Sequence, residues 1–207
     1  MANRPRLRVA VLVSGTGTNL QSVLDQCKAG AIDAEVSVVF SNRRDAYALE
    51  RAKRHKVPTE VLESSGLSRD EYDRKAMAAI DRYNPELVVL AGYMRILTPP
   101  FVDHYPDRII NIHPALLPSF PGIHAQRQAL EAGVKVSGCT THFVRAQVDA
   151  GPIILQKAVE VRDGDTEETL TARILEAEHE LLPKTVQLFA QKRLRVEGRR
   201  VRILAAP

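Results

Sequence analysis

Residues 8–20 read Arg8-Val9-Ala10-Val11-Leu12-Val13-Ser14-Gly15-Thr16-Gly17-Thr18-Asn19-Leu20. An apolar run ends in a glycine-rich loop and passes directly into a segment of helical length, which is typical of the first strand, loop and helix of an α/β sheet. At such a junction the backbone N–H groups of the loop and the helix dipole favour an anion. The stretch therefore predicts the fold class and a candidate phosphate site.

Two features of this loop limit what it binds. The third glycine of the dinucleotide motif G-x-G-x-x-G is replaced by Leu20, and the next predicted strand leads to Asn42 without an acid for a ribose hydroxyl. A Gly-Lys-Ser/Thr triplet is absent, which excludes a P-loop. A small phosphorylated ligand is the favoured interpretation, and the alternative is that Gly15 and Gly17 only permit a tight turn.

Short apolar runs alternate with amphipathic segments along the chain, which predicts a parallel sheet covered by helices on both faces. The expected strands are Arg8–Val13, Glu35–Phe40, Thr59–Leu62, Leu87–Leu90, Ile109–Ile112, Thr140–Val144 and Ile153–Val161. The expected helices are Asn19–Ala29, Ala46–His55, Ser68–Tyr83, Gly122–Ala132 and Thr166–Gln191. We therefore expect an α/β fold with a Rossmann-like, mostly parallel twisted sheet of about seven strands. A C-terminal hairpin turns at Glu197-Gly198, and without repeats or linkers residues 1–207 predict a single domain.

Capping signals mark two helix starts, and a proline interrupts one helix. Ser68 with Glu71, and Asp165 with Glu168, each place a capping acceptor three residues before a carboxylate. Pro183 lacks a backbone N–H, so we expect a kink or break in the last helix.

The composition is that of an ordinary soluble globular chain, with 44% hydrophobic and 26% charged residues. No run approaches the roughly 18 apolar residues of a membrane span, and the start of the chain lacks a signal-peptide pattern. We therefore expect a cytoplasmic protein without a membrane partner. Cys27 and Cys139 lack the spacing of a disulfide framework or a zinc site, so we expect both to be reduced and buried, and we expect no metal.

The charge pattern limits the kinds of molecule that the chain is expected to bind. The formal net charge is +4, and part of the basic excess lies at the two ends of the chain. With no Trp and 5% aromatic residues, this pattern argues against nucleic acid and fits a small anionic substrate. The oligomeric state is left open between monomer and homodimer.

The most informative polar pattern is Asn111-Ile112-His113-Pro114, which a proline-rich loop follows. Alternation along a strand places Asn111 and His113 on one face at its carboxyl end, the edge where open α/β sheets bind ligands. An amide donor stabilises a developing oxyanion, and a histidine moves a proton or, when protonated, also stabilises that charge. This pair predicts an active site.

An acid near His113 would favour the protonated imidazole, and Asp149 is the candidate. It lies in a turn, Val148-Asp149-Ala150-Gly151-Pro152, that follows the expected strand Thr140–Val144 and can reach the same sheet edge. The alternative is an ordinary turn acid and a hydrogen-bonded histidine at a strand end. His124 is expected to line the cleft. The other histidines are interpreted as structural or surface residues: His55, His104 and His142.

The chain resembles the formyltetrahydrofolate-dependent formyltransferases. The resemblance runs from about Arg8 to Gln191 and rests on Asn111-Ile112-His113-Pro114, Leu116-Leu117-Pro118, Asp149-Ala150-Gly151-Pro152, the Ser14–Leu20 loop, Phe40-Ser41-Asn42, Ala91–Leu97 and Glu178-His179. It implies an enzyme that passes the formyl group from N10 of 10-formyltetrahydrofolate to a primary amine through a tetrahedral intermediate. The implied acceptor is 5-phosphoribosylglycinamide of de novo purine biosynthesis.

The same resemblance assigns roles to residues. Asn111 and His113 would stabilise the oxyanion and move the proton, and Asp149 would raise the histidine pKa. The implied phosphoribosylglycinamide site consists of Gly17, Thr18, Asn19 and Glu178. The implied folate site consists of Arg69, Met94, Arg95, Ile96, Leu97, Asn111 and Val144. Without the resemblance, Glu178 and Arg69 would be solvated helix residues, and Met94, Ile96 and Leu97 would equally well be plain core.

Three other functions compete with amine formylation. A related hydrolase converts the same folate to formate, and a third enzyme formylates the methionine of initiator tRNA. The hydrolase carries an extra N-terminal module and the tRNA enzyme an added C-terminal domain, so we expect neither in 207 residues. The phosphate loop also favours a phosphorylated acceptor over water. The non-enzymatic alternative is a folate- or nucleotide-sensing protein with a decayed site, against which stands the presence of Asn111, His113 and Asp149.

Overall fold

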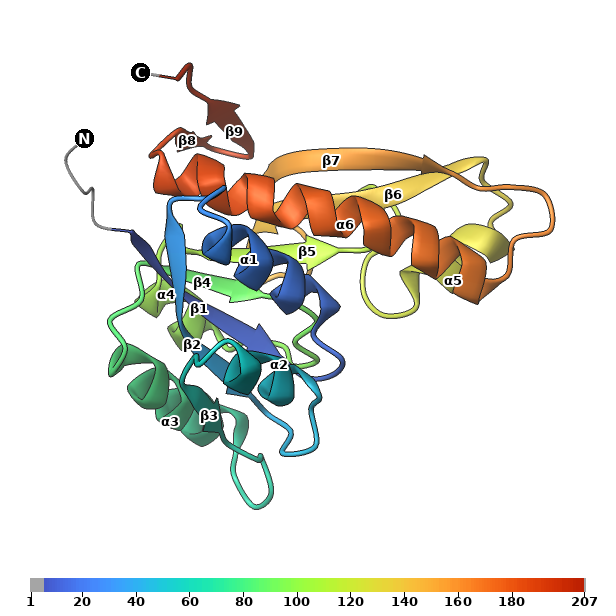
Figure 1. Ribbon diagram of the computed structural model, residues 1–207. Coiled ribbons are helices and arrows are strands. Elements are labelled where there is room, and N and C mark those ends of the chain that lie inside the picture. The colour runs from blue at the N-terminus through green and yellow to red at the C-terminus, as the bar shows by residue number, and fades with distance from the viewer. Residues whose placement is uncertain (1–5, 207) are drawn as a thin grey trace.

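The apolar runs of the sequence form the strands of one sheet. The computed structural model describes residues 6–206, and these contain β1 (Leu7–Val13), β2 (Ala34–Ser41), β3 (Thr59–Val61), β4 (Leu87–Leu90), β5 (Ile109–His113), β6 (Val136–Phe143), β7 (Ile153–Glu160), β8 (Leu194–Glu197) and β9 (Arg200–Ile203). The nine strands pair in the order β3-β2-β1-β4-β5-β6-β7-β9-β8 (Figure 1). The strands from β1 to β5 pair in parallel, whereas β6 is antiparallel to both β5 and β7. The Rossmann-like sheet with a C-terminal hairpin, β8–β9, is therefore confirmed.

Helices cover both faces of the sheet. They are α1 (Thr18–Lys28), α2 (Ala48–Arg54), α3 (Arg69–Asp81), α4 (Pro99–His104), α5 (Ala125–Glu131) and α6 (Glu167–Ala190). One face packs against α1, α2, α5 and α6, and the other packs against α3 and α4. The sequence did not predict α4, because six residues are too short to show a helical period. Helix α5 begins later than expected because His124 takes a left-handed φ of 59°.

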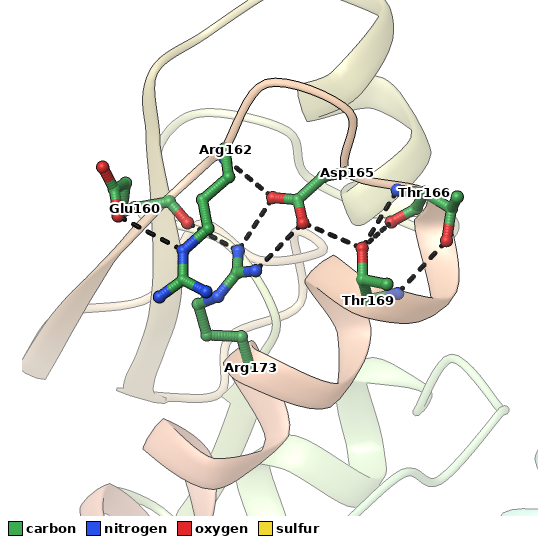
Figure 2. Close-up of polar contacts among 6 residues, drawn as sticks. All are labelled: Glu160, Arg162, Asp165, Thr166, Thr169 and Arg173. Atoms are coloured by element: carbon green, nitrogen blue, oxygen red, sulfur yellow. Dashed lines mark hydrogen bonds and ion pairs between the residues drawn. The ribbon is translucent and has the colours of Figure 1, made fainter.

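The two capping predictions had different outcomes. Ser68 and Glu71 form the expected capping box of α3. The expected cap of α6 was wrong by one residue, because Thr166 and Thr169 form the box (Figure 2). The Asp165 carboxylate instead accepts two hydrogen bonds from Arg173, at 2.8 and 2.9 Å, and so holds the first two turns of α6 against the preceding loop.

The expected break at Pro183 is wrong, because α6 continues through it (Figure 1). A proline inside a helix costs about 3 kcal/mol. Leu181, Leu182 and Val186 are buried around it, and burying one such side chain contributes about 1.5–3 kcal/mol. Packing of this segment on the sheet therefore offsets the cost of the proline.

The carboxyl ends of the central strands lie at one edge of the sheet. In Figure 1 the arrowheads of β1, β4 and β5 point to the same side. Ser14, directly after β1, connects the loops there: its Oγ donates to Oδ1 of Asn42 at 2.6 Å and accepts from the N–H of Met94 at 2.7 Å. The glycine-rich loop is thereby fixed to the segment after β4.

The structure bears on the expectations for the two cysteines and for membrane-spanning segments. Cys27 and Cys139 are buried free thiols. Burial raises the pKa of Cys27 to about 11 and that of Cys139 to about 12. Within residues 6–206, every helix is too short or too polar to cross a membrane.

Candidate active site

A cavity of about 730 Å³ opens at the carboxyl edge of the sheet. Its wall is formed by the segment 92–97 after β4, the end of β5 with the following Pro114, and the turn after β6 that contains Asp149. His124 also lines it, as expected. The structure thus brings the three candidate catalytic residues together around one cavity of a size that ordinarily holds a small molecule.

His113 is held by partners on both ring nitrogens. The residue is 4% exposed, and its Nδ1 lies 3.4 Å from Oδ2 of Asp149. Its Nε2 lies 2.8 Å from the carbonyl oxygen of Phe120. A carbonyl only accepts hydrogen bonds, so Nε2 carries the hydrogen in this contact. In the imidazolium form, both N–H groups therefore have acceptors.

Asp149 is the centre of a small polar cluster. Its side chain is 9% exposed, Oδ2 accepts from the N–H of Gly122 at 2.8 Å, and Oδ1 lies 3.6 Å from Nε2 of His142. Burial raises the pKa of Asp149, but the interactions with His142, Gly122 and His113 outweigh burial and lower the pKa below its usual value. The carboxylate is therefore ionised at neutral pH and faces two imidazole rings.

His142 is a site residue that the sequence analysis missed. It was interpreted as structural or surface, but it is buried and lines the cavity. It is the register partner of Asn111 across the antiparallel pair β5–β6. The polar run Thr140-Thr141-His142 inside a predicted strand was the available signal, and the direction of β6 was the missing information.

The glycine-rich loop has the features of an anion site. Gly17 is the N-cap of α1 at a left-handed φ of 72°, and within the described chain no side chain caps this helix. A Cβ on Gly17 would lie 2.5 Å from Cβ of Ala48, so a side chain has no room there. Thr18 and Asn19 follow in the first turn, which contains no acid. The N–H groups of this turn are available to a phosphate.

Glu178 is buried against this loop. The residue is 6% exposed, and its Oε2 accepts from Nδ2 of Asn19 at 2.7 Å. Burial raises the pKa of Glu178 to about 7, and the bond from Asn19 only partly opposes this. The solvated-helix interpretation of Glu178 is therefore wrong. Neither Glu178 nor the residues 17–19 line the cavity that contains His113.

The predicted folate residues lie in or beside the cavity. Arg95, Leu97, Asn111 and Val144 line it together with Met94 and Ile96. Met94 is 69% exposed and Ile96 is 58% exposed, so the plain-core interpretation fails for both. Arg69 lies outside the lining, and its Nη2 donates to the carbonyl oxygen of Ile96 at 3.0 Å. The guanidinium of Arg95 stacks 3.8 Å from the ring centre of Tyr72.

Comparisons with known proteins identify the family. A family model described as formyl transferase matches residues 7–186. The phosphoribosylglycinamide formyltransferase of Escherichia coli (strain K12) is 48% identical over 191 residues, which cover 92% of this chain and 90% of that protein. The solved structure of glycinamide ribonucleotide transformylase 1 from Symbiobacterium toebii is 52% identical with a TM-score of 0.95, covering 99% of this chain and 96% of that one. A formyltetrahydrofolate deformylase from Pseudomonas syringae pv. tomato is 27% identical with a TM-score of 0.92, covering 98% of this chain and 67% of that one. The chain belongs to the formyl transferase family.

Proposed function

We propose that this formyltransferase moves the formyl group of 10-formyltetrahydrofolate to the amine of 5-phosphoribosylglycinamide, a step of purine biosynthesis. The observation that carries the proposal is the convergence of His113, Asn111 and Asp149 on one cavity. Two relatives at 48% and 52% identity carry names of this activity, and that similarity extends over nearly the whole chain.

The proposed chemistry is a direct acyl transfer. The neutral amine attacks the formyl carbon, and the carbonyl electron pair moves to oxygen. Asn111 Nδ2 and the N–H of His113 that donates to Phe120 in the free protein would donate to this oxyanion. The protonated imidazole of His113 gives its Nε2 proton to N10, and the carbonyl re-forms as the bond between N10 and the formyl carbon breaks. The neutral imidazole then takes the proton that the newly formylated nitrogen releases. Asp149 would stabilise the charge on the imidazolium during these steps.

The two substrates would occupy different parts of the carboxyl edge of the sheet. The flat pterin of the folate suits the apolar cavity beside segment 92–97, where backbone groups supply polar contacts. The phosphate of the acceptor suits the first turn of α1, and Glu178 would contact the glycinamide end. A carboxyl with a pKa of about 7 can take a proton from an ammonium group and leave the amine nucleophilic.

Hydrolysis of the formyl folate is the second candidate, because a deformylase structure shares the fold at a TM-score of 0.92. The glycine loop and Glu178 favour a phosphorylated amine over water as the acceptor. Deformylation of the folate, followed by absorbance with and without phosphoribosylglycinamide, separates the two. We expect turnover only with the ribonucleotide. Equal turnover without it would assign hydrolysis, and no turnover in either would favour a binding protein.

A further inference from the structure

A second cavity, of about 470 Å³, lies at the amino edge of the sheet. It is formed by the residue before β1, the end of α1, the start of β2 and the end of α2. Because α1 and α2 run opposite to the strands, their last turns lie at the edge away from the active site, as Figure 1 shows for α1. The two cavities share no lining residue.

The charges around this cavity are strongly unbalanced. Four cationic side chains line it: Arg6, Lys28, Arg54 and Lys56. Glu35 is the one acid in the lining, and its Oε1 is engaged by Nη1 of Arg8 at 3.3 Å. Among residues 6–206, no carboxylate forms an ion pair with any of the four cations. Four cations against one carboxylate leave the cavity lining with an excess of positive charge.

Interaction with helix dipoles explains the position of only two of the four cations. Lys28 and Arg54 occupy the last turns of α1 and α2, where a cation complements the negative end of the helix. Arg6 and Lys56 lie outside any helix, yet both line the same cavity. Dipole compensation therefore does not explain why four cations meet here.

Apolar side chains form part of the cavity lining. Leu24, Cys27 and Val36 are buried side chains in its lining. Burial raises the pKa of the Cys27 thiol to about 11, so this group is neutral and does not repel an anion. Apolar side chains beside several cations suit a molecule with an organic body and a highly charged anionic group.

We propose that this cavity binds a phosphorylated organic anion of the class of nucleoside polyphosphates. The phosphates contact the four cations, and the organic part lies against the apolar side chains. The site is separate from catalysis, so it does not depend on the proposed acceptor or on formyl transfer.

Calorimetric titration with ATP, tripolyphosphate and adenosine tests the proposal. The cavity variant is Lys28→Gln with Arg54→Gln. The matched control is Lys53→Gln with Arg74→Gln, which removes two charges from α2 and α3 outside the cavity. We expect the unmodified protein to bind one ATP per chain and adenosine alone not to bind. The affinity for ATP should weaken about tenfold or more in the cavity variant and less than about twofold in the control.

Each other outcome overturns the proposal. Absence of ATP binding to the unmodified protein at about 5 mM removes the site. Equal weakening by both double variants assigns the binding to diffuse surface charge. Unchanged affinity in the cavity variant places the nucleotide elsewhere, the glycine loop included. Tripolyphosphate binding as tightly as ATP refutes the contribution of the organic part. Circular dichroism of both variants verifies that each is folded.

Discussion

Nδ2 of Asn111 lies 3.2 Å from Nε2 of His142, while Nδ1 of the same imidazole lies 3.0 Å from the carbonyl oxygen of Phe143. The carbonyl only accepts, so Nδ1 carries the hydrogen of the neutral ring. In this neutral ring Nε2 is an acceptor and receives one N–H of the Asn111 amide, whereas in the imidazolium form Nε2 carries a hydrogen toward Oδ1 of Asp149, 3.6 Å away. This contact fixes the orientation of the amide and leaves its second N–H for a substrate oxygen.

Removing this acceptor should affect catalysis more than binding. In His142→Ala the Asn111 amide loses the partner that orients it, and an oxyanion donor out of position costs transition-state stabilisation. We expect kcat to fall at least about tenfold, equivalent to about 1.4 kcal/mol, with KM for both substrates within about threefold. Steady-state kinetics measure this. His104→Ala, at an exposed histidine paired with Asp81, is the control, and equal kcat in the two variants would refute the role of His142.

Asp149→Asn tests the charge that faces His113 and His142. The pKa of Asp149 lies below its usual value, so the wild-type carboxylate is charged throughout the neutral range. The variant keeps the shape and removes the charge, so the imidazolium is stabilised less. We expect kcat to fall about 100-fold at pH 7.5 and the alkaline fall in rate to begin at lower pH. A pH–rate profile that keeps its shape would contradict this role.

Glu178→Gln should stabilise the free protein at high pH. The pKa of Glu178 is raised from 4.5 to about 7 by burial, so between these values the folded state binds more protons than the unfolded state. Stability contributed by this group is present below pH 4.5 and is lost as the pH rises through 7. The variant does not ionise, and we expect it to gain up to about 3 kcal/mol over wild type at pH 8.

Urea unfolding at pH 5 and pH 8 measures this difference. Glu176→Gln, on the same helix, is the matched control. If the free energy of unfolding of Glu178→Gln differs from that of wild type by the same amount at both pH values, Glu178 does not have the raised pKa. We also expect the variant to raise KM for the ribonucleotide, because the amine loses its carboxylate partner.

Gly17→Ala separates backbone strain from crowding in the glycine loop. The new Cβ would lie 2.5 Å from Cβ of Ala48 at a φ of 72°. Gly30→Ala is the control, since its φ is 71° and nothing lies within 4 Å of its Cβ. Left-handed strain costs about 1–2 kcal/mol in both variants. We expect Gly17→Ala to lose more stability than Gly30→Ala, and to raise KM for the ribonucleotide where the control does not. Similar stability and similar KM in the two variants would refute the close packing of the loop.

The parallel half of the fold was predictable from the sequence because its strands are short apolar runs between helical periods. Leu87–Leu90 was predicted with the bounds that β4 has. The antiparallel strand β6 was predicted too short, because the residues at its start include Gly138 at a close approach to β7. Pairing direction depends on contacts between distant segments, which a local pattern does not contain.

The part of the candidate site that comes from one short stretch of the sequence was predictable. Asn111 and His113 share one strand face, and both line the cavity. His142 was not predictable as a site residue, because it reaches Asn111 only through the register of β5 with β6. The burial of Glu178 likewise depends on how α6 packs against α1, which brings Asn19 to it.

The most direct test of formyl transfer at this site is the single-turnover rate of His113→Ala with both substrates saturating, alongside their dissociation constants. We predict a rate about 1000-fold below wild type, because the variant lacks both the oxyanion donor and the proton relay. Both dissociation constants should stay within about threefold, since His113 contributes little to ground-state binding. A rate equal to that of wild type, with both ligands bound, would contradict the account.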